Sequence, residues 1–450
     1  MTARVPTCRL VTLGCKVNQY ESQYVKEALE ANGYRAAADD ERADLCVVNT
    51  CTVTMEGDAK SRQSIRRLHH HNPGARIVVM GCYATRDPQA VGKLPGVVRV
   101  VTDKERLPEE LAEFGVAHWP RGIRRFDGHQ RAFVKVQDGC LLNCTYCIIP
   151  QVRPVVRSRR PEDVVAEVAG LVASGVQEIV LTGVHLGHYG IDLSQGKPKD
   201  QWRRLWHLLD LLGAMPGEFR MRLSSLEAAE ARDDLALVMA RQPRIVPHLH
   251  LCLQSGSDRI LARMKRRYRS CGFLQRCDRL RQALDQPAFT TDIIVGFPGE
   301  TEADFQDTLR LARAVGFAKM HVFSYSPRAG TPAATLADAV PPPVMAERRQ
   351  RLRALESELS AAYARGLLGR RLDVLVEGAD PDRPGHVIGT SCRALPVSFP
   401  GHAPALIGRL APVRATVLAN GMLLGEPTVE SWPQERLPSF KPSRMALPVL

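Results

Sequence analysis

The sequence predicts an α/β protein in three parts: an N-terminal Rossmann-like parallel-sheet domain, a central partial (βα)6 barrel and a C-terminal small β-barrel. Apolar strand-like runs alternate with helical patterns near the N-terminus, and strand-then-helix units repeat through the middle of the chain. Short β runs between turns fill the last part. We expect the domains to span residues 1–125, 126–365 and 366–430, followed by a flexible, Pro-rich tail at 431–450.

The N-terminal domain is predicted from three apolar runs that read as buried strands: RLVTL (9–13), DLCVVN (44–49) and RIVVM (76–80). Helical patterns at residues 21–34 and 58–71 separate them. Strands that alternate with helices form a parallel sheet, in which the carboxyl ends of the strands share one edge.

A cysteine follows each of these runs, namely Cys15, Cys51 and Cys82. We therefore expect the three thiolates to converge at the carboxyl edge of the sheet, where they would suit a [4Fe-4S] cluster with one iron left open. The alternative is three separate buried thiols.

The central part repeats a strand-then-helix unit, with six strand candidates at residues 133–137, 178–183, 219–226, 248–255, 289–299 and 319–327. Six units predict an open barrel whose chemistry lies at the carboxyl ends of the strands. A long amphipathic helix is expected at 345–369, before the β runs of the last domain.

A CxxxCxxC run, Cys140, Cys144 and Cys147, follows the first barrel strand. A structural zinc site closes its tetrahedron with four protein ligands, and an electron-transfer [4Fe-4S] cluster normally takes four cysteines. Three thiolates would leave one iron open to another ligand. Three buried or zinc-bound cysteines are the alternative reading.

The residue before the third cysteine is aromatic, Tyr146, so the run resembles the CxxxCxΦC motif of the radical S-adenosylmethionine (SAM) superfamily. Two three-cysteine groups in this order resemble the methylthiotransferase family over about residues 11–427. The strings TLGCKVNQYES, NTCTVT, KSRQSIRR, RLSSLE and IIVGFPGET are similar to the branch that acts on N6-threonylcarbamoyladenosine beside the tRNA anticodon. The isopentenyladenosine branch usually reads GCQMN at the first cysteine and the ribosomal-protein branch GCxKN, so Lys16-Val17-Asn18 favours the first branch.

This resemblance implies two [4Fe-4S] clusters and SAM as cofactors, with the six cysteines as the only protein groups needed for the chemistry. In the family, a 5′-deoxyadenosyl radical formed from SAM activates carbon 2 of the adenine ring, and the second cluster delivers the methylated sulfur. The resemblance also implies SAM contacts by Tyr146, by Thr182 and Gly183 near the methionine ammonium, by Ser225 near the ribose, and by Gly296 and Phe297 beside adenine.

A net charge of +13 favours a nucleic-acid partner, and it gathers in basic runs at residues 121–131, 153–160 and 259–269. We expect Arg157 and Arg266 to meet tRNA phosphates, and Arg153 is a candidate for the threonylcarbamoyl carboxylate. The last domain resembles the tRNA-gripping TRAM domain. An electron donor of the flavodoxin or ferredoxin type is a further expected partner.

The chain has no apolar stretch near the ~20 residues that span a bilayer and no secretory leader, so we expect a cytoplasmic protein without a membrane partner. Cys252 stands where the family commonly has proline, a departure interpreted as packing. Other functions stay open: methylthiotransfer to isopentenyladenosine in tRNA or to a ribosomal-protein aspartate, or a non-catalytic iron-sulfur electron carrier.

Overall fold

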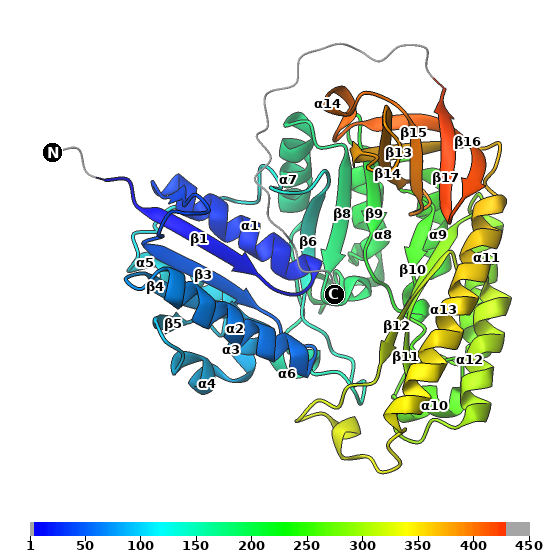
Figure 1. Cartoon of the computed structure of the whole chain (residues 1–450), viewed down its shortest axis with the longest axis horizontal. Coiled ribbons are helices and arrows are strands. Elements are labelled where there is room, and N and C mark those ends of the chain that lie inside the picture. The colour runs from blue at the N-terminus through cyan, green and yellow to red at the C-terminus, as the bar shows by residue number, and fades with distance from the viewer. Residues whose placement is uncertain (1–3, 429–450) are drawn as a thin grey trace.

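The computed structural model describes residues 4–428, so the predicted tail at 431–450 lies outside the described part of the chain. The N-terminal domain is a five-stranded parallel sheet in the order β2-β1-β3-β4-β5 (Figure 1). Its strands are β1 (Thr7–Thr12), β2 (Arg35–Ala36), β3 (Leu45–Thr50), β4 (Arg76–Gly81) and β5 (Val97–Val100). The three predicted strands are confirmed, and β2 and β5 are short edge strands that the sequence did not indicate.

Helices cover both faces of this sheet. They are α1 (Lys16–Ala31), α2 (Met55–His71), α3 (Cys82–Arg86), α4 (Pro88–Gly92), the 3-10 turn η1 (Lys104–Arg106) and α5 (Leu107–Ala112). Helices α1 and α5 share one apolar core with one face of the sheet, and α2, α3 and α4 share another core with the opposite face. Strand β3 is buried along its whole length, as expected of a central parallel strand.

Helix α1 begins at Lys16, five residues before the predicted start at residue 21. The amide of Asn18 donates hydrogen bonds to the carbonyl oxygens of Leu13 (2.8 Å) and Thr50 (3.1 Å). These bonds tie the first turn of the helix to the ends of β1 and β3. A polar residue that sequence patterns assign to a loop is therefore buried in a helix.

The central domain is a partial barrel formed by two hydrogen-bonded sheets, β7-β6-β8-β9 and β10-β11-β12. Isolated bridges between Met221 and Ile245 and between Leu226 and Leu251 join the two sheets. The strands are β6 (Ala132–Asp138), β7 (Arg157–Ser158), β8 (Glu178–Gly183), β9 (Arg220–Leu223), β10 (His248–His250), β11 (Ala288–Val295) and β12 (Lys319–Ser324). All six predicted barrel strands are present.

Helices and 3-10 turns connect the barrel strands. The elements are α6 (Ile149–Val152), α7 (Pro161–Ala173), η2 (Leu186–His188), η3 (Asp192–Ser194), η4 (Lys199–Gln201), α8 (Leu205–Gly213), η5 (Ala228–Glu230), α9 (Asp233–Arg241), α10 (Asp258–Arg263), α11 (Ser270–Ala283), α12 (Glu302–Val315), η6 (Pro332–Thr335) and α13 (Pro342–Arg365). Helix α12 illustrates the local signals, because Thr301 and Asp304 form a capping box and Gly316 ends the helix at φ +63°.

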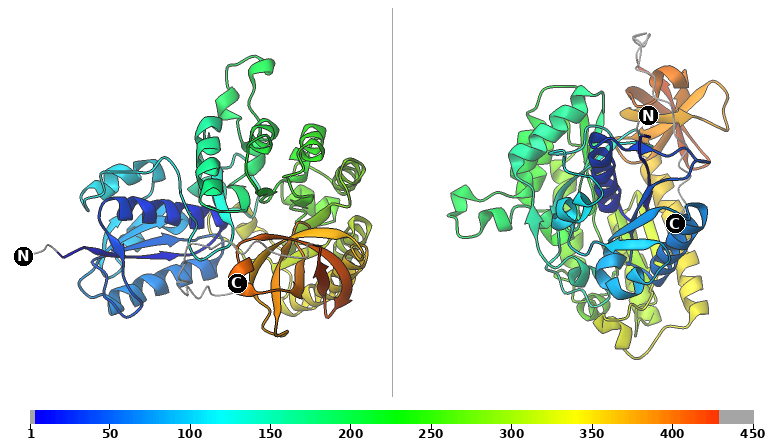
Figure 2. Two further views of the ribbon diagram at one scale, coloured as in Figure 1. Left: turned by 90° about the horizontal axis from the view of Figure 1, so that it is seen from above. Right: turned by 90° about the vertical axis from the view of Figure 1, so that its left-hand side faces the viewer.

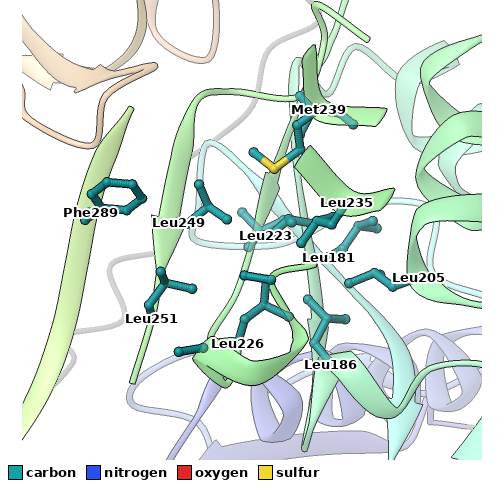
Figure 3. Close-up of a cluster of buried hydrophobic side chains, with 14 of the residues drawn as sticks. Leu181, Leu186, Leu205, Leu223, Leu226, Leu235, Met239, Leu249, Leu251 and Phe289 are labelled. Atoms are coloured by element: carbon teal, nitrogen blue, oxygen red, sulfur yellow. The ribbon is translucent and has the colours of Figure 1, made fainter. Parts of the chain in front are cut away.

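The main core lies between the barrel strands and these helices. Figure 3 shows Leu223, Leu249 and Phe289 from β9, β10 and β11 pointing to the same side of the sheet as Leu235 and Met239 of α9. Because successive side chains of a strand point to opposite faces, the residues between them face the inside of the barrel. That inner wall is polar.

The C-terminal domain is a closed barrel in the order β13-β14-β15-β17-β16. Its elements are β13 (Arg371–Ala379), β14 (His386–Ser391), β15 (Pro396–Pro400), α14 (Ala403–Leu406), β16 (Leu410–Ala419) and β17 (Met422–Pro427). It lies against the central barrel (Figure 2), where the Arg220 guanidinium donates to the carbonyl oxygens of Asp373 (2.6 Å) and Thr390 (2.8 Å). Among the described residues, no helix is long and apolar enough to cross a membrane.

Candidate functional site

The three N-terminal cysteines lie where strands of the parallel sheet end. Cys15 precedes α1, Cys51 follows β3, and Cys82 is the first residue of α3, directly after β4. Gly14 has a φ of +100°, and a Cβ at this position would lie 3.1 Å from the Cys51 sulfur. A side chain would crowd the sulfur, so glycine permits the close approach of the segments that carry Cys15 and Cys51. The fold thus brings the Cys15 and Cys51 segments together, and Cys82 follows the neighbouring strand β4.

This group also has a cation against one sulfur. The Arg153 guanidinium donates its Nε–H to the Cys82 Sγ over 3.4 Å and reaches Glu21 and Asp138 with its other nitrogens. Burial raises the pKa of the Cys51 thiol to about 11. Burial thus disfavours the thiolate form of Cys51. A bound metal ion would offset this, because a thiol that coordinates a metal is deprotonated outright.

The second group, Cys140, Cys144 and Cys147, lies in the loop between β6 and α6. Gly139 has a φ of +78°, and a Cβ there would overlap the carbonyl oxygen of Val155, so only glycine fits the start of the loop. The loop turns tightly, since the Cys147 amide donates to the Cys144 carbonyl (3.1 Å).

Here too an arginine contacts a sulfur, because Arg266 donates an Nη1–H to the Cys144 Sγ over 3.4 Å. Burial raises the pKa of the Cys147 thiol to about 12. The Cys147 thiol is thus protonated at neutral pH unless a metal ion binds it, and metal-bound thiolates are the donors that an iron-sulfur cluster requires.

The two cysteine groups are neighbours across α6. Ile149, the first residue of this short helix, packs in one apolar cluster with Cys82 and in another with Cys140, Cys144 and Cys147. The N-terminal sheet ends point toward this side of the barrel (Figure 1). The two triads therefore lie close together in the fold, on either side of Ile149.

The residues predicted to contact SAM lie at the carboxyl ends of barrel strands. Thr182 and Gly183 end β8, and a Cβ on Gly183 would lie 2.9 Å from the Gln137 Oε1. Ser225 is exposed in the loop after β9. The cysteine loop follows β6, the strand that pairs with β8.

The other predicted contacts gather after β11. Gly296 has a φ of +77°, and a Cβ there would overlap the Met345 side chain of α13. Phe297 is fully buried, packs edge-on against Tyr325 with ring centroids 5.4 Å apart, and shares an apolar cluster with Tyr146. Tyr146 also packs against the barrel cysteines, so it links them to the apolar cluster of Phe297.

Glu227 is a site residue that sequence reasoning did not single out, although it ends the RLSSLE string. Its side chain is 3% exposed, and neither carboxylate oxygen has a hydrogen-bond partner in residues 4–428. The nearest cation is Arg266, 3.8 Å away. A buried carboxylate without hydrogen bonds is costly, so this group calls for a ligand with N–H or O–H donors beside Cys144. The ammonium or ribose of SAM fits that requirement.

His185 and Glu230 form a second unpredicted pair beside the same loop. His185 Nε2 lies 2.6 Å from a Glu230 oxygen, and His185, His188 and Cys140 present nitrogen and sulfur atoms within 4.8 Å of one another. His185 belongs to the IVLTGVHLG string, but only the fold shows that it reaches Cys140.

The basic runs were predicted to meet phosphate, and this is wrong for Arg266; the carboxylate role predicted for Arg153 is wrong as well. Arg266 is 9% exposed and contacts Cys144 and Tyr268. Arg153 is 7% exposed and bound to Glu21 and Asp138, so it is not free to take the threonylcarbamoyl carboxylate. Long arginines next to a cysteine loop turn inward because the sulfurs and carboxylates there attract them. Arg157 is exposed, 3.6 Å from Asp103 and from Glu105.

Comparisons with known proteins agree with this arrangement. Residues 7–103 match the family described as uncharacterized protein family UPF0004, residues 134–312 the radical SAM superfamily, and residues 365–428 the TRAM domain. The chain is 38% identical over 423 residues to the threonylcarbamoyladenosine tRNA methylthiotransferase MtaB of Bacillus subtilis (strain 168), covering 90% of this chain and 92% of the relative.

A second relative, the tRNA-2-methylthio-N(6)-dimethylallyladenosine synthase of Corynebacterium urealyticum (strain ATCC 43042 / DSM 7109), is 37% identical over 392 residues, or 82% of this chain and 72% of the relative. The fold is shared with the radical SAM methyltransferase TsrM from Kitasatospora setae, with a TM-score of 0.53 and 16% identity, covering 74% of this chain and 77% of the other. On the length and identity of these matches, the chain belongs to the radical SAM methylthiotransferase family.

Proposed function

We propose that this protein attaches a methylthio group to carbon 2 of N6-threonylcarbamoyladenosine at position 37 of tRNA. The observation that carries the reaction type is the pair of cysteine triads that meet across Ile149. The substrate branch is supported by Lys16-Val17-Asn18 and by the MtaB relative, which matches 92% of its own length against 72% for the dimethylallyladenosine synthase.

Two [4Fe-4S] clusters form part of the proposal. Cys140, Cys144 and Cys147 would hold the cluster that binds SAM, and Cys15, Cys51 and Cys82 would hold a second one. The bound groups would supply electron transfer, radical hydrogen abstraction and sulfur, chemistry that side chains cannot perform.

The protein's own residues position and enclose these groups. Arg266 and Arg153 place positive charge against one sulfur of each triad and so favour the thiolate form. Glu227 offers an acceptor for the donors of SAM. Tyr146 would supply apolar surface for adenine, with the buried Phe297 in the same cluster, while Thr182, Gly183, Ser225 and Gly296 would lie at or just past the strand ends around SAM.

We further propose the three-domain division at residues 1–125, 126–365 and 366–430, a cytoplasmic location, and an electron donor of the flavodoxin or ferredoxin type. The TRAM match at 365–428 supports tRNA as the partner.

In the test, reconstituted protein is incubated with SAM, a reductant and one of three substrates: tRNA bearing threonylcarbamoyladenosine, tRNA bearing isopentenyladenosine, or the ribosomal protein. Mass analysis should find the methylthio group on the first substrate alone. Preferential modification of the isopentenyl tRNA, the alternative that the Corynebacterium relative favours, would refute the substrate assignment and leave the family unchanged.

A further inference from the structure

The inner wall of the barrel carries more positive charge than the described residues balance. Arg131, Arg220 and Arg222 all pair with one carboxylate, Glu178, at 3.3, 2.5 and 3.3 Å. Glu178 is fully buried. The second carboxylate that reaches these arginines is Glu377, which pairs with Arg131. The wall therefore has a surplus of cations.

Arg222 shows this surplus most directly. It is 6% exposed, and its Nη1 has no hydrogen-bond acceptor within residues 4–428. Its Nη2 donates a hydrogen bond to the Ser391 carbonyl (3.0 Å) and pairs with Glu178. The nearby carboxylate Asp292 is engaged by His250 at 3.3 Å. A buried N–H group without an acceptor is costly, so the Nη1 of Arg222 favours a ligand that carries an acceptor, an anion above all.

Lys16 is a further cation, and it belongs to the N-terminal domain. It is the first residue of α1, directly after Cys15, and its charge interacts with those of Arg222, Arg131 and Asp292. Its side chain is exposed, and its ammonium makes no hydrogen bond or ion pair with any residue in 4–428. Lys16 thus offers a free, accessible donor directly after Cys15.

We propose that Lys16, backed by the positive charge of Arg222, binds the carboxylate of the threonylcarbamoyl group. This inference rests on the proposed function, because that substrate carries a free carboxylate on its modified adenine and the isopentenyl group carries none. Charge-assisted hydrogen bonds from ammonium to carboxylate are roughly twice as strong as neutral ones. A carboxylate held at Lys16 would place the modified base beside Cys15, where the second triad lies.

The experiment separates this carboxylate from tRNA phosphate. Reconstituted protein is titrated anaerobically with three labelled anticodon stem-loops, which carry threonylcarbamoyladenosine, its methyl ester, or plain adenosine at position 37. All three present the same phosphates. The wild type should bind the acid about ten- to hundredfold more tightly than the ester, the ratio that corresponds to a hydrogen bond to a charged group of roughly 1.5–3 kcal/mol.

The variants are Lys16→Gln, Lys16→Arg and, as a matched loss of charge, Lys93→Gln at an exposed site of the same domain. Lys16→Gln should bring acid and ester within about twofold of each other, whereas Lys16→Arg and Lys93→Gln should keep the wild-type ratio. Iron content and SAM cleavage, measured on every variant, show that the fold and the neighbouring triad are intact.

An unchanged acid-to-ester ratio in Lys16→Gln overturns the inference, and so does an equal loss of affinity for all three stem-loops, which would mark Lys16 as a phosphate contact. Failure of the proposed function has a different signature. In that case the wild type itself would not distinguish the acid from the ester and would modify the isopentenyl substrate instead.

Discussion

The two cysteine triads are built in opposite ways. The barrel triad comes from a single loop of eight residues, 140–147, in which Cys140 and Cys144 are buried. The N-terminal triad is assembled from three separate strand ends and ranges from the exposed Cys15 to the buried Cys82. A buried loop suits a site that must control a reactive species, whereas an open sheet edge suits a site that has to reach a bulky substrate.

The two triads also share a device, since each has a buried arginine on one sulfur at 3.4 Å. The difference lies in where that arginine originates. Arg266 serves its own domain, but Arg153 extends from the barrel segment to Cys82 of the N-terminal domain. The N-terminal triad therefore depends on the central domain for its arginine. The barrel triad takes its arginine from its own domain.

The largest expected effect separates the chemistry of the triads. Cys144→Ala should abolish formation of 5′-deoxyadenosine, whereas Cys51→Ala should still form it and fail only to install the methylthio group. Each change should also remove about four of the roughly eight irons expected for two clusters. The readouts are iron content and nucleoside mass analysis.

Cys271→Ala, at an exposed cysteine of α11 outside both triads, is the matched control and should retain both activities. Equal loss of SAM cleavage in the Cys51 and Cys144 variants, with the fold intact, would contradict a division of labour.

The next effect concerns stability. Arg153→Ala leaves Glu21 and Asp138 with one buried cation fewer, which should cost about 3–5 kcal/mol. Hydrogen exchange of β3 amides should report the loss in the N-terminal domain. Arg125→Ala breaks half-exposed pairs with Glu30 and Asp127 and should cost about 1 kcal/mol or less. If the two variants are equally stable, the inter-domain network is not the support described.

The same network predicts a dependence on pH. Burial raises the pKa of Glu21, but the charges of Arg153, Lys104 and Lys135 outweigh burial and hold this pKa well below its usual value. A carboxyl with a lower pKa in the folded chain than in the unfolded chain stabilises the fold above its unfolded pKa, and this contribution is lost as pH falls. Wild-type stability should therefore drop below about pH 4, and unfolding at graded pH should show a smaller drop in Arg153→Ala.

A smaller effect is expected at the barrel triad. Arg266→Ala removes the cation on the Cys144 sulfur, which should lower the cluster's reduction potential and decrease SAM cleavage by about 10- to 100-fold, as is typical for partners of metal ligands. A redox titration followed by electron paramagnetic resonance would measure the potential. The exposed neighbour provides the control, because Arg267→Ala should leave the potential unchanged.

The smallest effect is at the surface. Arg157 is exposed, and Arg157→Ser should reduce the slope of log affinity against log salt for tRNA by about one. Arg310→Ser removes a more exposed charge from α12 and should leave the slope unchanged. A similar decrease in both variants would mean that the slope reports overall charge and not a contact near the triads.

Much of this architecture could be predicted because its signals are local. The spacing of Cys140, Cys144 and Cys147 is visible within one loop, and the alternation of strands and helices was enough to bring Cys15, Cys51 and Cys82 to one sheet edge. Partners of buried charges could not be predicted in this way. The basic runs led us to interpret Arg153 and Arg266 as surface residues. The sulfur that each contacts is distant in the sequence, and only the fold shows that they are neighbours.

The contact between Arg153 and Cys82 spans 71 residues, which gives it a consequence for how the protein is made. During synthesis, the strands and helices that carry Cys15, Cys51 and Cys82 leave the ribosome before Arg153 does. The first domain can acquire its sheet at that stage, but its sulfur site is completed only when the start of the barrel has emerged and docked. Grafting the N-terminal domain onto an unrelated barrel would transfer three cysteines and leave behind the charge that supports one of them.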